Sequence, residues 1–242
     1  MWAICKKEWI QYFSSLTGYL AIILFLGLNG LLLFVFSSFN ILDFGYASLE
    51  SFFTLAPYIL LFLIPAITMR LFPDEYRNGT IEILRTKPIA VYQLVGGKFL
   101  AAMGVITISL LPTMLYVFTI DQLKAAGTAL DIGTLLCAYG GLFLLAGCFA
   151  ALSICCSSFT LNAVAAFLIS LFACLTMYAG FEAIASLPIF RDGADYYLEM
   201  PGIAAHYRSI ARGVIDSRDI IYFITLIFLM LYTTTVSIEK KN

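Results

Sequence analysis

The stretch GTLLCAYGGLFLLAGCFAALSIC, residues 133–155, carries no charged side chain anywhere along its length. The hydrocarbon core of a bilayer is about 30 Å thick, so a helix needs roughly 20 consecutive apolar residues to cross it. An isolated strand would leave its backbone polar groups unpaired in lipid. The stretch therefore predicts a membrane-spanning helix.

Five other stretches have the same character. Together with the first they place transmembrane helices at residues 16–36, 53–72, 100–120, 133–155, 160–183 and 220–237. The chain is 62% hydrophobic and only 12% charged, whereas soluble domains carry about 25% charged residues. We expect an all-α, polytopic integral membrane protein with six transmembrane helices, forming a single domain over residues 1–242.

The ends of the spans predict the orientation and two local features. Residues 1–15 mix aromatic and charged side chains, which is typical of an interfacial helix in the headgroup layer, and no small-residue cleavage pattern follows. The fourth and fifth spans are joined by the short loop CSSFT, residues 156–160. Nine basic residues lie on the side of the termini and five on the other, so both termini are expected in the cytoplasm and the protein in the inner membrane.

The chain lacks the residue patterns of enzymes and metal sites. It has six cysteines without a CxxC motif and one histidine, His206, which we expect in a loop. Arg70, Lys98 and Glu182 lie near span ends, from which long side chains snorkel to the interface. Gly96-Gly97-Lys98 is followed by Phe99 and is not a phosphate-binding loop. We expect no catalytic residue, cofactor or metal, and the net charge of −1 gives no basic field for nucleic acid.

An island of charge, FPDEYRNGTIEILRTKP, occupies residues 72–88. Pro73 suits the first turn of a helix, with Asp74 and Glu75 at its positive end, and Asn78-Gly79 breaks the chain direction. A second short helix is then expected, capped by Thr80 and stopped by Pro88. It presents Ile81, Ile83 and Leu84 beside Glu82 and Arg85. Apolar side chains with a charged rim are typical of a protein docking site; the alternative is a topology signal with incidental structure.

The segment between the fifth and sixth spans, residues 188–218, is the longest one outside the spans. A helical stripe runs along it through Ile203, Tyr207, Ile210, Ala211 and Val214, and Arg208 and Arg212 share another face. This amphipathic outer segment dips into the outer leaflet, caps a cavity or is simply an exposed loop. Pro57, Pro65 and Pro112 interrupt the second and third spans and either bend them or only shape their packing.

Two motifs resemble the permeases of ABC-2-type transporters. The order ExxxGTxExLxxxP, with Glu75, Gly79, Thr80, Glu82, Leu84 and Pro88, resembles their cytoplasmic coupling segment, and HYRSIARGVIDSRDIIYF, residues 206–223, resembles the segment before their last helix. The resemblance implies a type V exporter-like permease fold with a coupling helix between helices 2 and 3, over residues 73–90. Within the family, the chain is most like the gliding-motility-associated permease subunit.

The resemblance also implies function and partners. It implies a non-enzymatic permease subunit, most simply of an exporter, driven by a cytoplasmic ABC ATPase subunit and paired with a second permease, identical or related. The lipid bilayer and an accessory gliding component complete the expected partners. The ATPase-coupling contact is expected at Glu75, Gly79, Thr80, Ile81, Glu82, Leu84, Arg85 and Pro88. The alternatives are a membrane scaffold of a gliding or surface-secretion machine that does not transport, and a stand-alone channel, against which the docking site argues.

Overall fold

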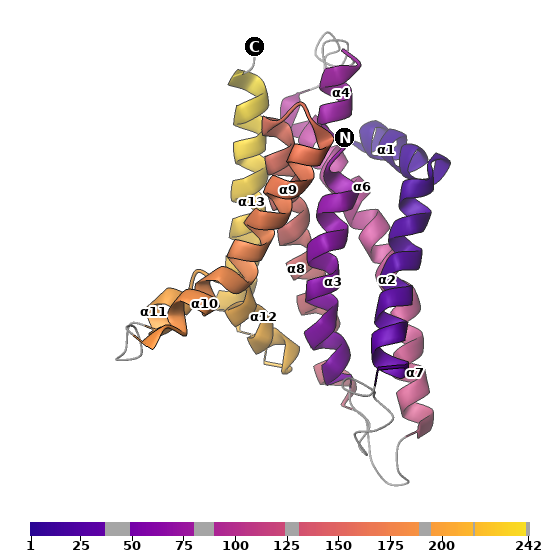
Figure 1. Ribbon diagram of the computed structural model, residues 1–242, viewed down its shortest axis with the longest axis vertical. Helices are drawn as coiled ribbons and strands as arrows, with labels where there is room; N and C mark the ends of the chain where they lie inside the picture. Colours follow the sequence, from indigo (N-terminus) through magenta and orange to yellow (C-terminus); the bar gives the residue numbers. More distant parts are fainter. Residues whose placement is uncertain (37–48, 80–89, 124–130, 189–194, 215, 241–242) are drawn as a thin grey trace.

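The computed structural model describes residues 1–36, 49–79, 90–123, 131–188, 195–214 and 216–240 (Figure 1). Over these residues the regular structure is entirely helical, which confirms the all-α prediction. The first half of the chain forms α1 (Trp2–Ser14), α2 (Leu16–Phe34), α3 (Glu50–Thr68), α4 (Pro73–Arg77) and α6 (Val91–Leu110). The second half forms α7 (Met114–Leu123), α8 (Ile132–Phe159), α9 (Ala163–Leu175), α10 (Phe181–Ala185), α11 (Asp195–Glu199), α12 (Ile203–Ala211) and α13 (Ser217–Lys240).

Six of these helices or continuous helix runs are long and apolar enough to cross a membrane, which confirms the predicted number. They are Leu16–Phe34, Glu50–Arg77, Val91–Gln122, Ile132–Phe159, Ala163–Ala185 and Ser217–Lys240. Several extend beyond the apolar stretches of the sequence. The third begins at Val91 rather than near Leu100, and α8 continues to Phe159, so the connection to α9 is residues 160–162 rather than the predicted CSSFT loop.

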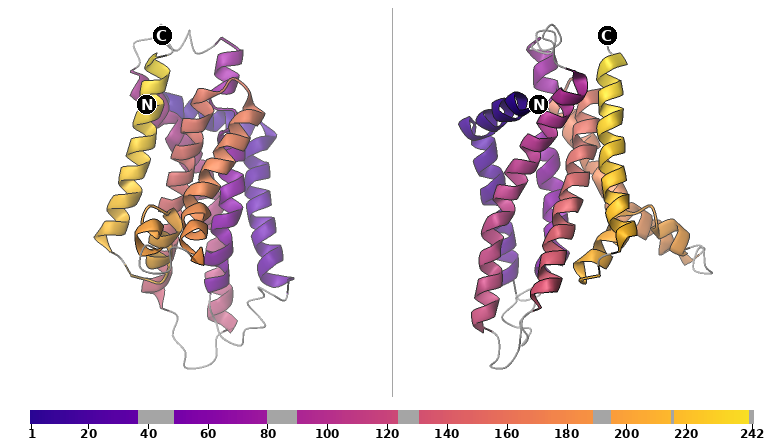
Figure 2. Two further views of the ribbon diagram at one scale, coloured as in Figure 1. Left: turned by 60° about the vertical axis from the view of Figure 1, so that its left-hand side comes forward. Right: turned by 180° about the vertical axis from the view of Figure 1, so that it is seen from behind.

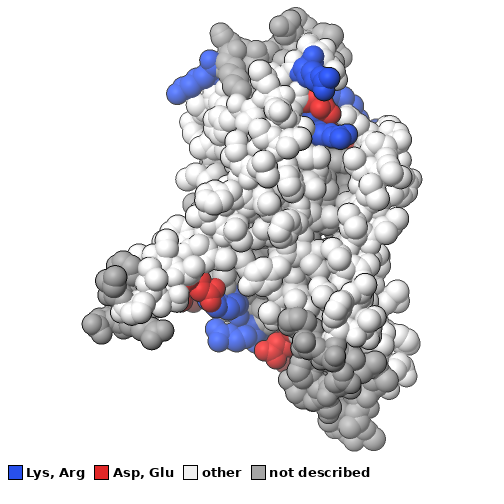
Figure 3. Space-filling model, viewed as in Figure 1, with Lys and Arg blue, Asp and Glu red and all other residues white. Residues whose placement is uncertain are grey.

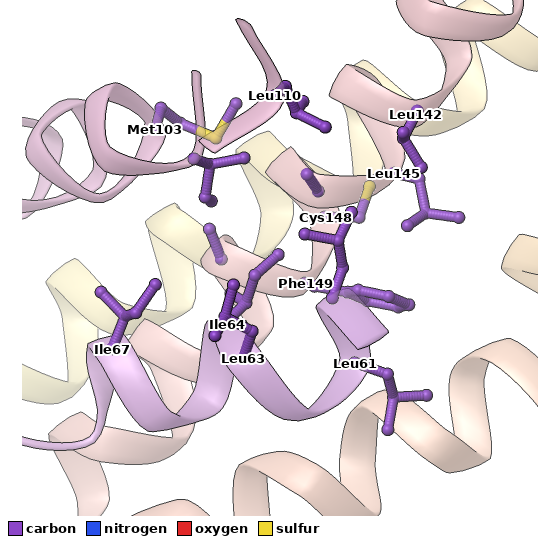
Figure 4. Packing of buried hydrophobic residues seen from close by; sticks show 14 of the residues in the cluster. Leu61, Leu63, Ile64, Ile67, Met103, Leu110, Leu142, Leu145, Cys148 and Phe149 are labelled. Carbon is purple, nitrogen blue, oxygen red and sulfur yellow. The ribbon is translucent and has the colours of Figure 1, made fainter. Parts of the chain in front are cut away.

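The central helix of the bundle is α8, which packs against α3, α6, α9, α12 and α13. Its buried face consists largely of small residues, such as Ala146, Gly147 and Ala150, and these let neighbouring backbones approach closely. Figure 4 shows larger side chains of three helices meeting over this surface. They are Leu61, Leu63, Ile64 and Ile67 of α3, Met103 and Leu110 of α6, and Leu142, Leu145, Cys148 and Phe149 of α8.

Both termini lie at the same end of the bundle, together with α4 (Figures 1 and 2). We call this the termini end and the opposite one the far end. At the termini end, α1 lies across the bundle at a steep angle to the spanning helices. Toward the far end, α10 and α11 form an arm that projects from the body of the bundle, α12 turns back to pack against α8, and α13 then runs along the bundle to the termini end.

The prolines of the second and third spans occupy two different settings. Pro57 and Pro65 lie inside the continuous helix α3, where each removes one backbone hydrogen bond. Pro112 lies in a 3₁₀ turn, Leu111–Thr113, that separates α6 from α7. The regular α-helix is thus interrupted at Pro112, whereas α3 passes through both of its prolines.

Candidate functional site

The predicted coupling contact lies only partly within the described residues. Glu75 belongs to α4, and Gly79 follows this helix closely. The other predicted contact residues lie outside the part of the chain that the structure describes: Thr80, Ile81, Glu82, Leu84, Arg85 and Pro88. The geometry of this segment is therefore that of α4 and its surroundings.

The short helix α4 begins and ends where its sequence indicates. Pro73 occupies the first turn, where its missing N–H leaves no bond unmade, and Asp74 and Glu75 lie near the positive end of the helix. Asn78 ends the helix, and Gly79 has a φ of +65°. Glycine takes this left-handed conformation without steric cost.

At the base of α4 lies a group of charged side chains that we call the ion cluster, formed by Lys7, Glu8, Glu75 and Lys98. Lys98 is fully buried. Its Nζ lies 2.9 Å from Oε1 of Glu8 and 2.9 Å from Oε1 of Glu75, and it donates to the carbonyl oxygen of Leu71 at 2.8 Å. An ammonium group has three hydrogens. Three oxygens therefore surround Lys98 and match its donors in number.

The cluster balances two cations against two carboxylates. Lys7 donates to Oε1 of Glu75 at 3.0 Å and lies 3.5 Å from Oε1 of Glu8, so Oε1 of Glu75 bridges both lysines. Partial burial alone would lower the pKa of Lys7, but the carboxylates of Glu75 and Glu8 outweigh it and raise that pKa. The ring of Phe72, centred 5.2 Å from Nζ of Lys98, adds a cation–π contact.

The cluster joins four parts of the chain. Glu8 and Lys7 come from α1, Glu75 from α4, Lys98 from α6, and the carbonyl of Leu71 from the connection between α3 and α4. Removing one member of a buried ion pair leaves an uncompensated charge, at a cost of about 3–5 kcal/mol. The arrangement therefore holds these four parts in one relative position.

Glycines of α6 bring α1 close enough for these contacts. A Cβ at Gly97 would lie 2.9 Å from the side chain of Ile4, and one at Gly104 would overlap the ring of Trp9. The Trp9 indole donates to the carbonyl oxygen of Ala101 at 3.2 Å. The Gly-Gly-Lys sequence thus serves helix packing: the glycines admit α1, and Lys98 binds Glu8.

The expectation that Lys98 snorkels to the interface is wrong. The helix begins at Val91, so Lys98 lies two turns inside α6, and α1 covers it. Residues 1–15 are helical as predicted, with Glu8 and Tyr12 buried against the bundle and Trp2 exposed, and their interfacial location stays a prediction. A lysine within an otherwise apolar helix is itself a signal of a function or a buried partner; the sequence contains that signal at Lys98, but it does not identify Glu8 as the partner.

A second feature, the far-end cavity, lies between the arm and the body and has a volume of about 920 Å³. Figure 3 shows basic and acidic side chains gathered in the hollow beneath the arm, separated by an uncharged surface from the charges at the termini end. The charged lining residues are Glu50, Glu182, Glu199, Arg208 and Arg212, and the aromatic ones are Phe53, Tyr58, Tyr178 and Tyr207.

One wall of this cavity is α12, the helix predicted from the stripe in the outer segment. Ile203, Tyr207 and Ile210 are buried, and the Tyr207 hydroxyl donates to the carbonyl oxygen of Phe53 at 2.7 Å. Ala211 is partly buried, but Val214 lies beyond the end of α12 and is exposed. Of the three alternatives for the outer segment, the described residues favour the one in which it borders a cavity.

His206 lies in α12 rather than in a loop, which corrects the sequence-based expectation. Its Nδ1 is 2.7 Å from Oδ1 of Asp219, its Nε2 is 2.8 Å from the carbonyl oxygen of Met200, and its ring stacks on Tyr222 at 4.0 Å. The Tyr222 hydroxyl donates to the carbonyl oxygen of Pro201 at 2.6 Å. These contacts fix α12 to the start of α13.

Neither feature has the composition of a catalytic or metal centre. Within the described ranges, no group of three or more His, Cys, Asp or Glu side chains is placed to hold a metal ion. The buried cysteines, Cys5, Cys148, Cys155 and Cys174, pack as small apolar side chains, as expected. The two features are a buried ion cluster at one end of the bundle and an amphipathic cavity at the other.

Comparison with known protein families gives a match. Residues 39–197 match the model of a family described as ABC-2 family transporter protein. The matched range includes α3, α4, α6 and α8, and hence Glu75 and Lys98, but neither Glu8 nor the arginines of α12. No curated protein matches the chain. Since the family model covers more than half of the 242 residues, this multi-pass chain belongs to the ABC-2 family of transporter proteins.

Proposed function

We propose that the chain is the permease subunit of an ABC exporter and receives mechanical work from a separate ATPase subunit through α4 and the segment that follows it. In this proposal Gly79 and the predicted contact residues after α4 touch the ATPase, whereas Glu75, which is buried, attaches α4 to the bundle. Since the basic residues are more numerous at the termini end, we place this end in the cytoplasm. The ATPase would bind there.

The observation that carries this proposal is the buried ion cluster. A coupling segment transmits motion only if it is firmly attached to the helices that must move. Lys98 attaches α4 to α6 and α1 at once, and only residues 69–72 separate α4 from α3. Displacement of α4 would therefore be shared by α1, α3 and α6 with little slack.

The same geometry suggests where the motion is absorbed. α3 contains Pro57 and Pro65, and the run from α6 to α7 is interrupted at Pro112. Helices bend most easily where a backbone hydrogen bond is missing. In this mechanism, α6 and the part of α3 near the termini end move with α4, whereas α7 and the far-end part of α3 move differently. Movement of α3 would reshape the far-end cavity, which it lines.

A second permease is proposed as the partner within the membrane. Less than a third of the apolar length of α2, α9 and α13 is buried. The exposed side chains include Ile23 and Leu24 of α2, Leu168 and Phe172 of α9, and Ile224 and Phe228 of α13. Lipid covers such a surface in part, and a second permease, identical or related, would cover the rest. We propose gliding motility as the process that this export serves.

Affinity capture from native membranes tests the proposal. Tagged wild-type chain should retain an ABC ATPase, and the double variant Glu82→Lys with Leu84→Asp should lose it while inserting in the membrane normally. Arg218→Glu serves as the charge-changing control, because Arg218 is exposed at the start of α13, at the far end. Capture of the ATPase by the double variant would remove the segment after α4 as the contact.

Vesicles that contain the captured complex separate a transporter from a scaffold. A permease should give ATP-dependent movement of a molecule across the membrane. ATP hydrolysis that responds to the permease without any transported species would support the scaffold alternative instead. Glu75→Gln should keep the ATPase bound but uncouple hydrolysis from transport, because it weakens the attachment of α4 without removing the contact.

A further inference from the structure

The far-end cavity is lined by both charged and aromatic side chains. Glu50 lies at the first turn of α3, and Tyr58 lies two turns further along the same helix, a distance of about 12 Å at 1.5 Å per residue. The Tyr58 and Tyr178 rings meet edge to face, with centroids 5.5 Å apart. Along α3, the lining therefore runs from the carboxylate of Glu50, at the rim, to this pair of rings.

Its volume fits one small molecule. The cavity of about 920 Å³ lies near the upper end of the range of about 300–1,000 Å³ that ligand sites occupy. Such sites are mainly apolar, with a few polar groups that orient the ligand. The far-end cavity is more polar than this pattern, because five of its lining residues are charged, but its tyrosines each offer a ring face as well as a hydroxyl.

The charged groups at the rim are not all neutralised by one another. Arg208 pairs with Glu182, with Nη1 2.6 Å from Oε1. Arg212 donates through Nε to the carbonyl oxygen of Arg208 at 3.1 Å, but no carboxylate among the described residues forms an ion pair with it. The carboxylate of Glu199 likewise forms no ion pair with a lysine or arginine in the described ranges. One cation and one anion at the rim thus remain available to a ligand.

The walls are held in place by specific contacts. Tyr178 lies in a π-helical turn, Thr176–Gly180, between α9 and α10, and such turns occur frequently at functional sites. α12 lies against α8 because Gly141 has no side chain: a Cβ there would be 2.8 Å from Cγ2 of Ile210. Gly213, with a φ of +86°, ends α12 against Thr134. The walls of the cavity are thus helices and turns that packing contacts hold in place.

We propose that the far-end cavity binds a zwitterionic amphiphile. Arg212 would bind its anionic group, such as a phosphate, Glu199 its ammonium, and Tyr58 and Tyr178 its apolar portion. Guanidinium groups bind phosphate with paired hydrogen bonds, and aromatic rings give a large apolar contact area. With three carboxylates against two guanidiniums at the rim, a multiply charged anion would be repelled.

As a statement of substrate class this inference rests on the proposed function, but binding does not depend on it. The measurement therefore uses the full chain alone, in maltoside micelles, without ATPase or ATP. Absence of binding would then overturn the cavity ligand while leaving ATPase capture intact. Loss of ATPase capture would overturn the coupling proposal while leaving binding intact.

The probe is radiolabelled lysophosphatidylethanolamine, measured by equilibrium binding. Glycerophosphoethanolamine, which has the head group alone, should compete at least about tenfold more weakly, because it lacks the apolar chain. Lysophosphatidylglycerol, which has the phosphate and chain but no ammonium, should also bind about tenfold more weakly. If the head group alone competed equally well, the rings of Tyr58 and Tyr178 would not contribute to binding, and the proposal would be overturned.

Three substitutions assign the parts of the site. Arg212→Ala should weaken binding of the probe by about tenfold or more, as expected for losing a hydrogen bond to a charged group. Tyr58→Ala should weaken the binding of the probe and of lysophosphatidylglycerol by the same factor. Glu199→Ala should weaken the probe but not lysophosphatidylglycerol, and so remove the preference between them.

Matched controls keep these results specific. Arg218→Ala removes an exposed arginine that does not line the cavity, and Tyr232→Ala removes an exposed tyrosine of α13 that also lies outside it. Both should bind the probe as wild type does. If Arg212→Ala binds the probe with unchanged affinity, or if the two lipids bind equally to wild type, the zwitterion site is overturned.

Discussion

Lys98 at the termini end and Arg208 at the far end each lie close to a carboxylate, at 2.9 Å and 2.6 Å, but in opposite surroundings. The Lys98 side chain is completely buried and its two glutamates are 4% and 8% exposed, whereas the Arg208 and Glu182 side chains are 46% and 44% exposed. The buried ammonium is surrounded by three oxygens. The exposed arginine shares its rim with water and with Arg212.

The difference in burial explains why we assign the two ends different tasks. Breaking a buried ion pair costs free energy because the remaining charge is not solvated. The partners therefore stay together and hold their helices in a fixed arrangement. Exposed pairs contribute about 0–1 kcal/mol and exchange readily with water or other ions. The ion cluster is suited to transmitting force, and the rim of the far-end cavity is suited to exchanging one charged partner for another.

The largest expected effect comes from removing the buried ammonium. Lys98→Ala should lower the free energy of unfolding by about 3–5 kcal/mol, because Glu8 and Glu75 then face each other with only the half-exposed Lys7 nearby. Arg208→Ala should lower it by less than about 1 kcal/mol. Reversible unfolding in a mixed-micelle SDS titration measures both. Equal losses for the two variants would contradict the contrast between the ends.

Replacing all the buried charges of the ion cluster tests whether they are needed for stability or for coupling. A variant with Glu8→Gln, Glu75→Gln and Lys98→Met should recover most of the stability that Lys98→Ala loses, to within about 1–2 kcal/mol of wild type, because no buried charge is left uncompensated. It should still couple poorly to the ATPase. Normal transport by this variant would show that apolar packing alone is enough to join α4 to the bundle.

The packing of α12 against α8 can be tested by substituting two adjacent glycines, Gly140 and Gly141. Gly141→Ala should cost about 1–3 kcal/mol, since its Cβ would press on Ile210 and displace α12. Gly140→Ala is the matched control, because nothing lies within 4 Å of its Cβ. Alanine there should be neutral or stabilising by up to about 1 kcal/mol through helix propensity. Thermal stability and probe binding would be measured for both.

The smallest effect is expected at the exposed pair. Glu182→Gln should change the free energy of unfolding by less than about 1 kcal/mol, and the change should shrink further as salt rises, since the Debye length falls from about 10 Å at 0.1 M to about 3 Å at 1 M. Titrating salt in the same unfolding assay measures this. The loss caused by Lys98→Ala should not respond to salt, and a strong response would mean that water reaches the ion cluster.

Much of the architecture was predictable because it depends on local composition. Apolar length gives the six spans, Pro73 and Gly79 punctuate α4, and the stripe through Ile203, Tyr207 and Ile210 predicts α12. Boundaries were less predictable, since helices such as α6 and α8 continue past their apolar stretches where tertiary contacts support them. Of the predicted coupling contact, only Glu75 and Gly79 lie in the described residues, and the contact itself remains a prediction.

The sequence by itself thus determined that this chain spans a membrane six times and which segments carry its charges, because the free energy of transfer into lipid depends on residues that are neighbours in the chain. Only the tertiary structure decided that Lys98 meets Glu8, 90 residues away, and that Tyr58, Tyr178 and Arg212 border one cavity. Those contacts depend on which helix faces meet, and small residues such as Gly97 and Gly141 set how closely they do so.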